Sequence, residues 1–227
     1  MKEEPVVFLP PGAVRQSLPD KQKPRIRLSR NGPYLVAVDD LTNSKGERLQ
    51  GWNGVALCRC GASHKKPFCD SSHIRIGFSD DQRPDRTPDG VVDYPGANLV
   101  VSFNRLQCSA SGRCAKSLPL VFREGERPWI QPDRADADAI AEVVRRCPSG
   151  ALRYTWHGQP GPSEARAPRI RIARNGPYEV EGFDLDTGNW SEGASRERYT
   201  LCRCGGSKNK PFCDGTHRSI NFQDDGN

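Results

Sequence analysis

The chain has 227 residues, of which 35% are hydrophobic, and it carries a formal net charge of +6 at pH 7. A mean hydropathy of −0.73 excludes a single large apolar core, so we expect several small domains, which normally need disulfides or bound metal for stability. No apolar segment reaches the length of a membrane span, and we therefore expect a soluble protein located in the cytoplasm.

The nine cysteines are an odd number, which cannot form a complete disulfide framework. In a reducing cytoplasm, cysteines are interpreted as metal ligands or catalytic groups before they are interpreted as disulfides. The cysteine content therefore predicts that the chain binds metal.

A repeated unit follows a proline-rich N-terminal extension over residues 1–23. The segment PRIRLSRNGPYLV at 24–36 is matched by PRIRIARNGPYEV at 168–180, and the cysteine-rich segments beyond them align at the same offset. We expect domains over residues 24–82 and 168–227. In each, alternating apolar and basic residues predict a half-buried strand, Asn-Gly-Pro predicts a turn, and a second short strand follows.

Each repeat contains one motif of three cysteines and a histidine. The first copy reads CRCGASHKKPFCDSSH and the second reads CRCGGSKNKPFCDGTH. The expected metal ligands are Cys58, Cys60, Cys69 and His73 in the first copy, and Cys202, Cys204, Cys213 and His217 in the second. The third cysteine and the histidine are four residues apart, so both can point from one face of a helical turn into one site. Three thiolates and one imidazole suit either structural zinc or a [2Fe-2S] cluster.

Other residues of the motif predict how the site is shaped, and each has a counterpart in the second copy. A proline before the third cysteine places the start of the helix near that cysteine, with Asp70 as its cap. We expect Gly61 to let the backbone approach inorganic sulfide and the Ser63 hydroxyl to donate a hydrogen bond to it. Basic residues such as Arg59 are expected to surround the site and make reduction easier.

Residues 83–156 are expected to hold a linker and a small domain of a different type. LVVSF at 99–103 predicts a strand, and ADADAIAEVVRRC predicts a helix. The apolar face of that helix is formed by Ala137, Ile140, Ala141 and Val144. The segments 79–95 and 157–167 are rich in proline, glycine and charge, which predicts linkers.

Three further cysteines, Cys108, Cys114 and Cys147, lie in this middle segment. CSASGRC with a distant Cys-Pro keeps the first, third and final cysteines of a bacterial ferredoxin set, with Ser111 at the second position. Three thiolates can hold a [3Fe-4S] cluster, which we favour, or a [4Fe-4S] cluster whose fourth iron takes an oxygen, a nitrogen or water. The alternative is three unrelated thiols, because free cysteine often behaves as a small buried hydrophobe.

Both repeated motifs resemble the CDGSH iron-sulfur signature of the NEET proteins. The second copy fits at every position, whereas the first has Ser71 where the family has glycine. The resemblance implies one [2Fe-2S] cluster in each repeat, with the three cysteines and the histidine as ligands. Family members pair two such units about a two-fold axis, so we expect the two repeats to pair within this chain.

The middle segment resembles the divergent mono-cluster ferredoxin family through NLVVSF, PWIQPD and CPSGAL. Many members have a histidine two residues after the first cysteine, where this chain has Ala110, so no role of that histidine carries over. The resemblance implies a small ferredoxin-like domain with one cluster. The expected fold class is α+β, with two small strand-and-loop-rich CDGSH domains as a pseudo-two-fold pair and the ferredoxin-like domain.

These features predict a multi-cluster iron-sulfur protein for electron transfer, redox sensing or cluster transfer, whose partner is a redox or cluster-acceptor protein. We do not expect an enzyme, because the chain lacks a nucleotide-binding glycine loop, a G-x-S-x-G sequence and an acid-base pair near the ligands. The alternative is a zinc-stapled module that binds protein or nucleic acid. Nucleic acid is disfavoured because arginine and lysine are spread along the chain and aromatic residues make up only 7% of it.

Overall fold

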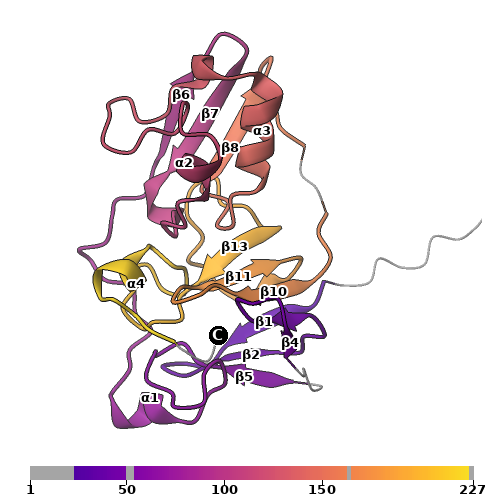
Figure 1. Ribbon diagram of the computed structural model, residues 1–227. Coiled ribbons are helices and arrows are strands. Elements are labelled where there is room, and N and C mark those ends of the chain that lie inside the picture. The colour runs from indigo at the N-terminus through magenta and orange to yellow at the C-terminus, as the bar shows by residue number, and fades with distance from the viewer. Residues whose placement is uncertain (1–22, 50–53, 163–164, 225–227) are drawn as a thin grey trace, which may run out of the picture.

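The computed structural model describes residues 23–49, 54–162 and 165–224, which form a mixed α and β structure with three small sheets (Figure 1). Apart from Lys23, the expected N-terminal extension lies outside the described residues. Within the described ranges, no helix has both the length and the apolar character needed to cross a membrane.

The two repeats form two sheets that exchange strands. The first sheet has the order β12-β1-β2-β5 and the second has the order β13-β11-β10-β3-β4. The bounds in the first sheet are β1 (Arg25–Leu28), β2 (Tyr34–Val36), β5 (Val55–Leu57) and β12 (Asp184–Leu185). Those in the second are β3 (Leu41–Thr42), β4 (Arg48–Leu49), β10 (Arg169–Ile172), β11 (Tyr178–Glu181) and β13 (Arg198–Leu201). Strand β12 pairs in parallel with β1, and β3 pairs in parallel with β10, so each repeat completes the sheet of the other.

One apolar core lies between these two sheets and is built from both repeats. The predicted alternation places Ile26 and Ile170 inside this core, and both side chains are fully buried. The Tyr34 and Tyr178 rings meet edge to face within the core, with their centroids 6.0 Å apart. Because side chains of both repeats fill this core, we expect neither repeat to bury its apolar residues alone.

The middle domain has a four-stranded sheet of order β6-β7-β8-β9. Its elements are β6 (Val91–Pro95), β7 (Leu99–Asn104), β8 (Leu152–Trp156), β9 (Gln159–Pro160), α2 (Arg113–Ser117) and α3 (Ala137–Arg145), with short 3-10 turns at Arg105–Gln107 and Pro132–Arg134. The predicted strand is β7 and the predicted helix is α3. Helix α3 buries Ile140, Ala141 and Val144 as its spacing predicts.

Two segments that we expected to be linkers contribute strands. Strand β6 lies within 79–95 and β9 lies within 157–167, and both are edge strands of the middle sheet. Each ends in a proline, which an edge strand tolerates because one side of its backbone needs no partner. The linker prediction was therefore wrong for these residues, because they pair with β7 and β8, and composition does not show such pairing.

The second repeat lies between the first repeat and the middle domain, as Figure 1 shows along the length of the molecule. Arg198 in β13 donates to the Val144 carbonyl oxygen at the end of α3, at 3.0 Å. Asn209 in the second motif donates to the Leu106 carbonyl oxygen at 3.3 Å. The second motif therefore contacts the middle domain directly.

Candidate metal centres

Each cysteine-histidine motif is a loop that folds back on the strand that precedes it. In the first copy, the Cys58 N–H donates to the Pro67 carbonyl at 2.8 Å, and the Cys69 N–H donates to the Ala56 carbonyl at 2.8 Å. The corresponding bonds of the second copy measure 2.9 and 3.0 Å. A four-residue helical turn, α1 (Ser72–Arg75) or α4 (Thr216–Ser219), then carries the histidine. The two loops thus present their ligands in the same way.

The four candidate ligands of each motif lie in two pairs. The Cys58 and Cys60 sulfur atoms are 3.7 Å apart, and the Cys69 sulfur is 3.4 Å from His73 Nδ1. The second copy has 3.9 Å between its first two sulfur atoms and 3.4 Å between the third sulfur and Nδ1 of the histidine. Two thiolates on one tetrahedral metal ion with bonds of about 2.3 Å lie about 3.8 Å apart. Each pair therefore has the spacing of two ligands on one metal ion.

This arrangement favours a two-metal cluster over a single zinc ion. Structural zinc requires all four ligands to converge on one point. Throughout the described residues, no group of three or more Cys, His, Asp or Glu side chains forms such a single-ion site. Two ligand pairs, each suited to one metal ion, fit a [2Fe-2S] cluster with one iron held by two thiolates and the other by thiolate and imidazole.

Asp70 lies near the start of the helical turn, but the prediction that it is the cap is wrong, because Ser71 is the N-cap residue and the helix begins three residues after the third cysteine. Asp70 accepts hydrogen bonds from the Ser72 N–H at 3.0 Å and from the His64 N–H at 2.8 Å. A hydrogen bond from the Ser72 side chain, followed by these two backbone bonds, holds the pKa of the Asp70 carboxyl well below its usual range. Asp214 makes the equivalent bonds to the Thr216 and Lys208 N–H groups. The aspartate thus joins the start of the helical turn to the middle of the loop.

Ser71 adopts the backbone conformation that the signature glycine would have. Its φ is 68°, in the left-handed region, and Gly215 at the same position of the second copy has φ 92°. A residue with a Cβ loses about 1–2 kcal/mol in this region relative to its preferred conformation. The substitution therefore preserves the loop at a backbone cost confined to the first copy.

The motif glycines lie where the two loops meet, and their expected approach to inorganic sulfide stays a prediction. Gly61 and Gly205 flank an antiparallel bridge between Cys60 and Cys204. A Cβ on Gly61 would lie 2.7 Å from the Cys204 carbonyl carbon, and one on Gly205 would lie 2.8 Å from that of Cys60. Real Cβ atoms essentially never approach closer than 3.0 Å, so these glycines permit close contact between the two loops.

Two buried tyrosines, which the sequence reasoning missed, also join the repeats. The Tyr34 hydroxyl contacts the Cys202 and Pro211 carbonyl oxygens at 2.9 and 3.0 Å. The Tyr178 hydroxyl contacts the Cys58 and Pro67 carbonyls at the same distances. Burial raises the pKa of both phenols, so both remain neutral donors. The signal for them was the RNGPY sequence, which occurs in both copies.

The serine and arginine of the motif serve the backbone. The Ser63 hydroxyl donates to the Phe68 carbonyl at 2.7 Å, so its proton does not point to a cluster sulfide as expected. Arg59 is 2% exposed, donates to the Gly32 carbonyl at 2.8 Å and forms an ion pair with Asp80. The second copy has the same bonds in Ser207 and in the Arg203–Asp224 pair. Both arginine charges are therefore balanced, and their expected effect on reduction is smaller.

The three middle cysteines come from three elements that meet at the end of the domain nearest the second repeat. Cys108 follows the first 3-10 turn, Cys114 lies in α2, and Cys147 follows α3. All three pack against the core of the middle domain. Burial, and secondarily the charge of Cys147, raises the pKa of Cys108, and the same causes raise the pKa of Cys114 to about 11. The three thiols therefore lie against one core, although the described residues contain no group of three or more Cys, His, Asp or Glu side chains arranged around one metal ion.

Two family models match the chain. Residues 31–74 and 175–218 match the model described as iron-binding zinc finger, CDGSH type, and residues 94–157 match the divergent 4Fe-4S mono-cluster model. The chain carries two CDGSH domains flanking a divergent 4Fe-4S mono-cluster domain. CDGSH domains bind [2Fe-2S] clusters, as the paired ligands indicate, and the match of the middle domain favours [4Fe-4S] over the expected [3Fe-4S] cluster.

The chain is also similar to a protein named uncharacterized protein YjdI from Escherichia coli strains K12 and O157:H7. Each of these relatives is 39% identical over 65 residues, which make up 29% of this chain and 86% of the relative. No solved structure matches the chain.

In each CDGSH domain the first two cysteines are hydrogen-bonded to each other, and one thiol of the pair loses its proton more readily than the other. The hydrogen bond from Cys60 lowers the pKa of Cys58 to about 6, and it raises the pKa of Cys60 itself. In the second domain the lowered pKa belongs to Cys204, for the same reason. Metal binds thiolates, so the Cys58 thiolate is available at neutral pH, and the Cys204 thiolate forms more readily than that of an ordinary cysteine.

The two CDGSH domains differ in the exposure of their histidines. His217 is buried, at 8% exposed, whereas His73 is half-buried. Burial, and secondarily the charge of Arg218, lowers the pKa of His217. The second domain therefore holds its imidazole in the neutral form that metal binding requires.

Proposed function

We propose that this protein is an electron carrier that holds three iron-sulfur clusters in one chain and serves a separate redox partner without catalysing a reaction itself. One observation carries the proposal. The ligand loop of the second CDGSH domain contacts the ligand loop of the first on one side and the cysteine loop of the middle domain on the other.

The contact between the two CDGSH domains is made by the ligand loops themselves. Cys60 and Cys204, each a ligand, are bridge partners. The tyrosine hydroxyls bond carbonyl groups of the opposite loop, including that of Cys58 or Cys202. Short covalent and hydrogen-bonded connections between ligands suit transfer of an electron from one domain to the other.

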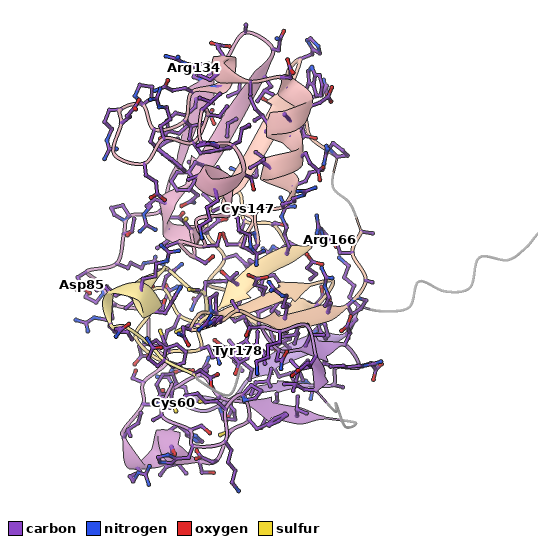
Figure 2. The ribbon with its side chains drawn as sticks, viewed as in Figure 1. Cys60, Asp85, Arg134, Cys147, Arg166 and Tyr178 are labelled. Atoms are coloured by element: carbon purple, nitrogen blue, oxygen red, sulfur yellow. The ribbon has the colours of Figure 1, made fainter. Side chains whose placement is uncertain are left out.

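The contact with the middle domain is equally close. A Cβ on Gly215 would lie 3.0 Å from the Ala110 Cβ and 3.6 Å from the Cys108 carbonyl oxygen. Arg113, next to Cys114, forms an ion pair of 2.5 Å with Glu179 of the second domain. Figure 2 shows Cys147 at this junction and Cys60 beyond Tyr178. The three sites thus follow one another through contacts of the chain, with the second CDGSH domain in the central position.

Iron-sulfur clusters accept and release single electrons when bound. The chain keeps the ligands of the CDGSH sites fixed: exchanged strands, buried tyrosines and the Arg59–Asp80 and Arg203–Asp224 pairs all brace the loops. A site that changes little in shape suits reversible electron transfer. Cluster transfer would instead require a loop to open, and the loops of both CDGSH domains are closed by the opposite repeat.

Cluster transfer is the second candidate, and it applies to the first CDGSH domain. His73 is followed by two apolar side chains at the surface, Ile74 and Ile76, which are 75% and 49% exposed. Such residues beside an accessible ligand suit docking of an acceptor protein. Incubation of the loaded protein with a metal-free ferredoxin tests this function, and transfer of the cluster would favour it over electron transfer.

The electron-carrier proposal is tested by EPR spectroscopy of anaerobically reconstituted, reduced protein. We expect reversible reduction and a magnetic interaction between the middle cluster and that of the second CDGSH domain. Cys213→Ala should abolish the interaction, while Cys69→Ala, the equivalent change in the first domain, should leave it. Clusters that cannot be reduced reversibly, or an interaction that survives Cys213→Ala, would contradict the proposal.

A further inference from the structure

A cleft lined with arginines lies where the middle domain meets the second CDGSH domain. Its volume is about 420 Å³, and its wall includes Cys147 and Pro148. The arginines come from segments far apart in sequence: Arg113 from α2, Arg145 and Arg146 from the end of α3, Arg198 from β13, and three more from the segment that enters and forms β10. We call this feature the arginine cleft. In Figure 2 the labelled Arg166 and Cys147 both lie at this junction.

Three glutamates line the cleft, and each is shared by two arginines. Glu179 pairs with Arg113 at 2.5 Å and with Arg171 at 3.2 Å. Glu181 pairs with Arg166 at 2.9 Å and with Arg169 at 2.6 Å. Glu142 pairs with the two arginines of α3 at 3.1 and 2.7 Å.

Among the described residues that line the cleft, seven guanidinium groups and three carboxylates give a formal charge of +4. The whole chain carries +6. Most of the excess positive charge is therefore gathered at one place, beside a cysteine of the middle site.

The arginines divide into two groups by their contacts. Arg166 and Arg198 donate to the Arg145 carbonyl at the end of α3, two residues before Cys147, and so fix the floor of the cleft. Arg146 and Arg169 lie at the rim, with side chains 68% and 50% exposed. The rim guanidinium groups can bind a partner without loss of the bonds that position Cys147.

We propose that the arginine cleft is the docking site of an acidic redox protein, which approaches the middle cluster at Cys147; this rests on the proposed electron-carrier function. Guanidinium groups bind carboxylates with two parallel hydrogen bonds. A gathered charge also accelerates encounter with a partner of opposite sign.

Nucleic acid and small anions fit the cleft less well. Among the described residues, no aromatic side chain lines the cleft, so bases have no surface on which to stack. The three glutamates divide six of the arginines into three ion-paired groups, which spreads the positive charge along the cleft. A protein surface with several separated carboxylates matches this pattern.

The test measures binding of a strongly acidic plant-type ferredoxin to the loaded full-length protein by calorimetry at low and high salt. The double reversal Arg146→Glu/Arg169→Glu should weaken binding at least about tenfold at low salt. Lys45→Glu/Arg134→Glu makes the same change of net charge at two exposed positions away from the cleft, and it should have little effect. Equal binding by both double variants would overturn the proposal.

Two further probes decide between kinds of ligand. The probes are a single-stranded oligothymidine and inorganic pyrophosphate. If either binds the wild type and binds the cleft variant more weakly, while ferredoxin binding is the same in both, the proposal is overturned in favour of a phosphate site. The EPR spectra of the cleft variant should match those of the wild type. Failure of reversible reduction with intact ferredoxin binding would refute the electron-carrier function while supporting the docking site.

Discussion

The contact between the two CDGSH loops predicts that an added methyl group at Gly61 is unusually destabilising. Gly61 has φ +79°, and Gly46, in the hairpin of β3 and β4, has φ +84°. Alanine at either position has the same unfavourable backbone conformation, which costs about 1–2 kcal/mol. Among the described residues beyond its chain neighbours, no atom lies within 4 Å of a Cβ added at Gly46, so Gly46→Ala measures the backbone cost alone.

Gly61→Ala adds a steric term to the backbone term. Its Cβ would lie 2.7 Å from the Cys204 carbonyl carbon, whereas ordinary contacts begin at 3.4 Å. The neighbour is backbone and part of the bridge between the two loops, so it cannot rotate away. Overpacking of this kind costs about 1–3 kcal/mol. We expect the free energy of unfolding to fall by about 2–5 kcal/mol in Gly61→Ala and by about 1–2 kcal/mol in Gly46→Ala.

Urea unfolding of the loaded protein, followed by circular dichroism and by visible absorbance of the clusters, measures the difference. Gly205→Ala should resemble Gly61→Ala, because its Cβ meets the Cys60 carbonyl group in the same way. If Gly61→Ala and Gly46→Ala lower the unfolding midpoint equally, the two loops do not contact each other as described.

Four other predictions concern the braces and ligands of the sites. Ser71→Gly should stabilise the first CDGSH domain by about 1 kcal/mol, because it removes the backbone cost at φ 68°. On heating, this variant should lose its first cluster at a higher temperature than the wild type. Gly215→Ser should destabilise the second domain. Tyr178→Phe should lower the free energy of unfolding by about 1–3 kcal/mol and alter the EPR signal of the first cluster. Tyr199→Phe removes a buried hydroxyl that bonds the Phe183 carbonyl within the second domain, so it should lose similar stability and leave that signal unchanged. Ser149→Ala should lower the reduction potential of the middle cluster in a redox titration. The Ser149 hydroxyl lies 3.7 Å from the Cys147 sulfur, and hydrogen bonds to cluster thiolates raise the potential. An unchanged potential would show that the hydroxyl does not bond this sulfur. Loss of the CDGSH clusters should accelerate as the pH falls, because a protonated imidazole cannot bind iron. Burial lowers the pKa of His217, so the second domain should lose its cluster only at a lower pH. When cluster loss in acid is followed by absorbance, His73→Cys should slow it more than His217→Cys.

Short-range features could be predicted because the chemistry is local. Spacing predicted the strands at Ile26 and Ile170, the helix from Ala137, and the eight candidate CDGSH ligands, since residues two or four apart have fixed directions on a strand or helix. The pairing of the repeats was expected only through a resemblance. The domain boundaries stay a prediction, and the exchange of β3 and β12 shows how the two CDGSH domains share one core.

Long-range features could not be predicted, and they decide how the sites relate to one another. The sequence alone determined which side chains can bind iron, because a thiolate or imidazole ligand is identified by its type and by its near neighbours. Only the tertiary structure decided that Gly61 and Gly205 meet the opposite loop, that Arg59 is neutralised by Asp80, and that arginines from separate segments gather beside Cys147. The physical reason is that contact and charge depend on distance in space, and residues that are not near neighbours in sequence acquire that distance only when the chain folds.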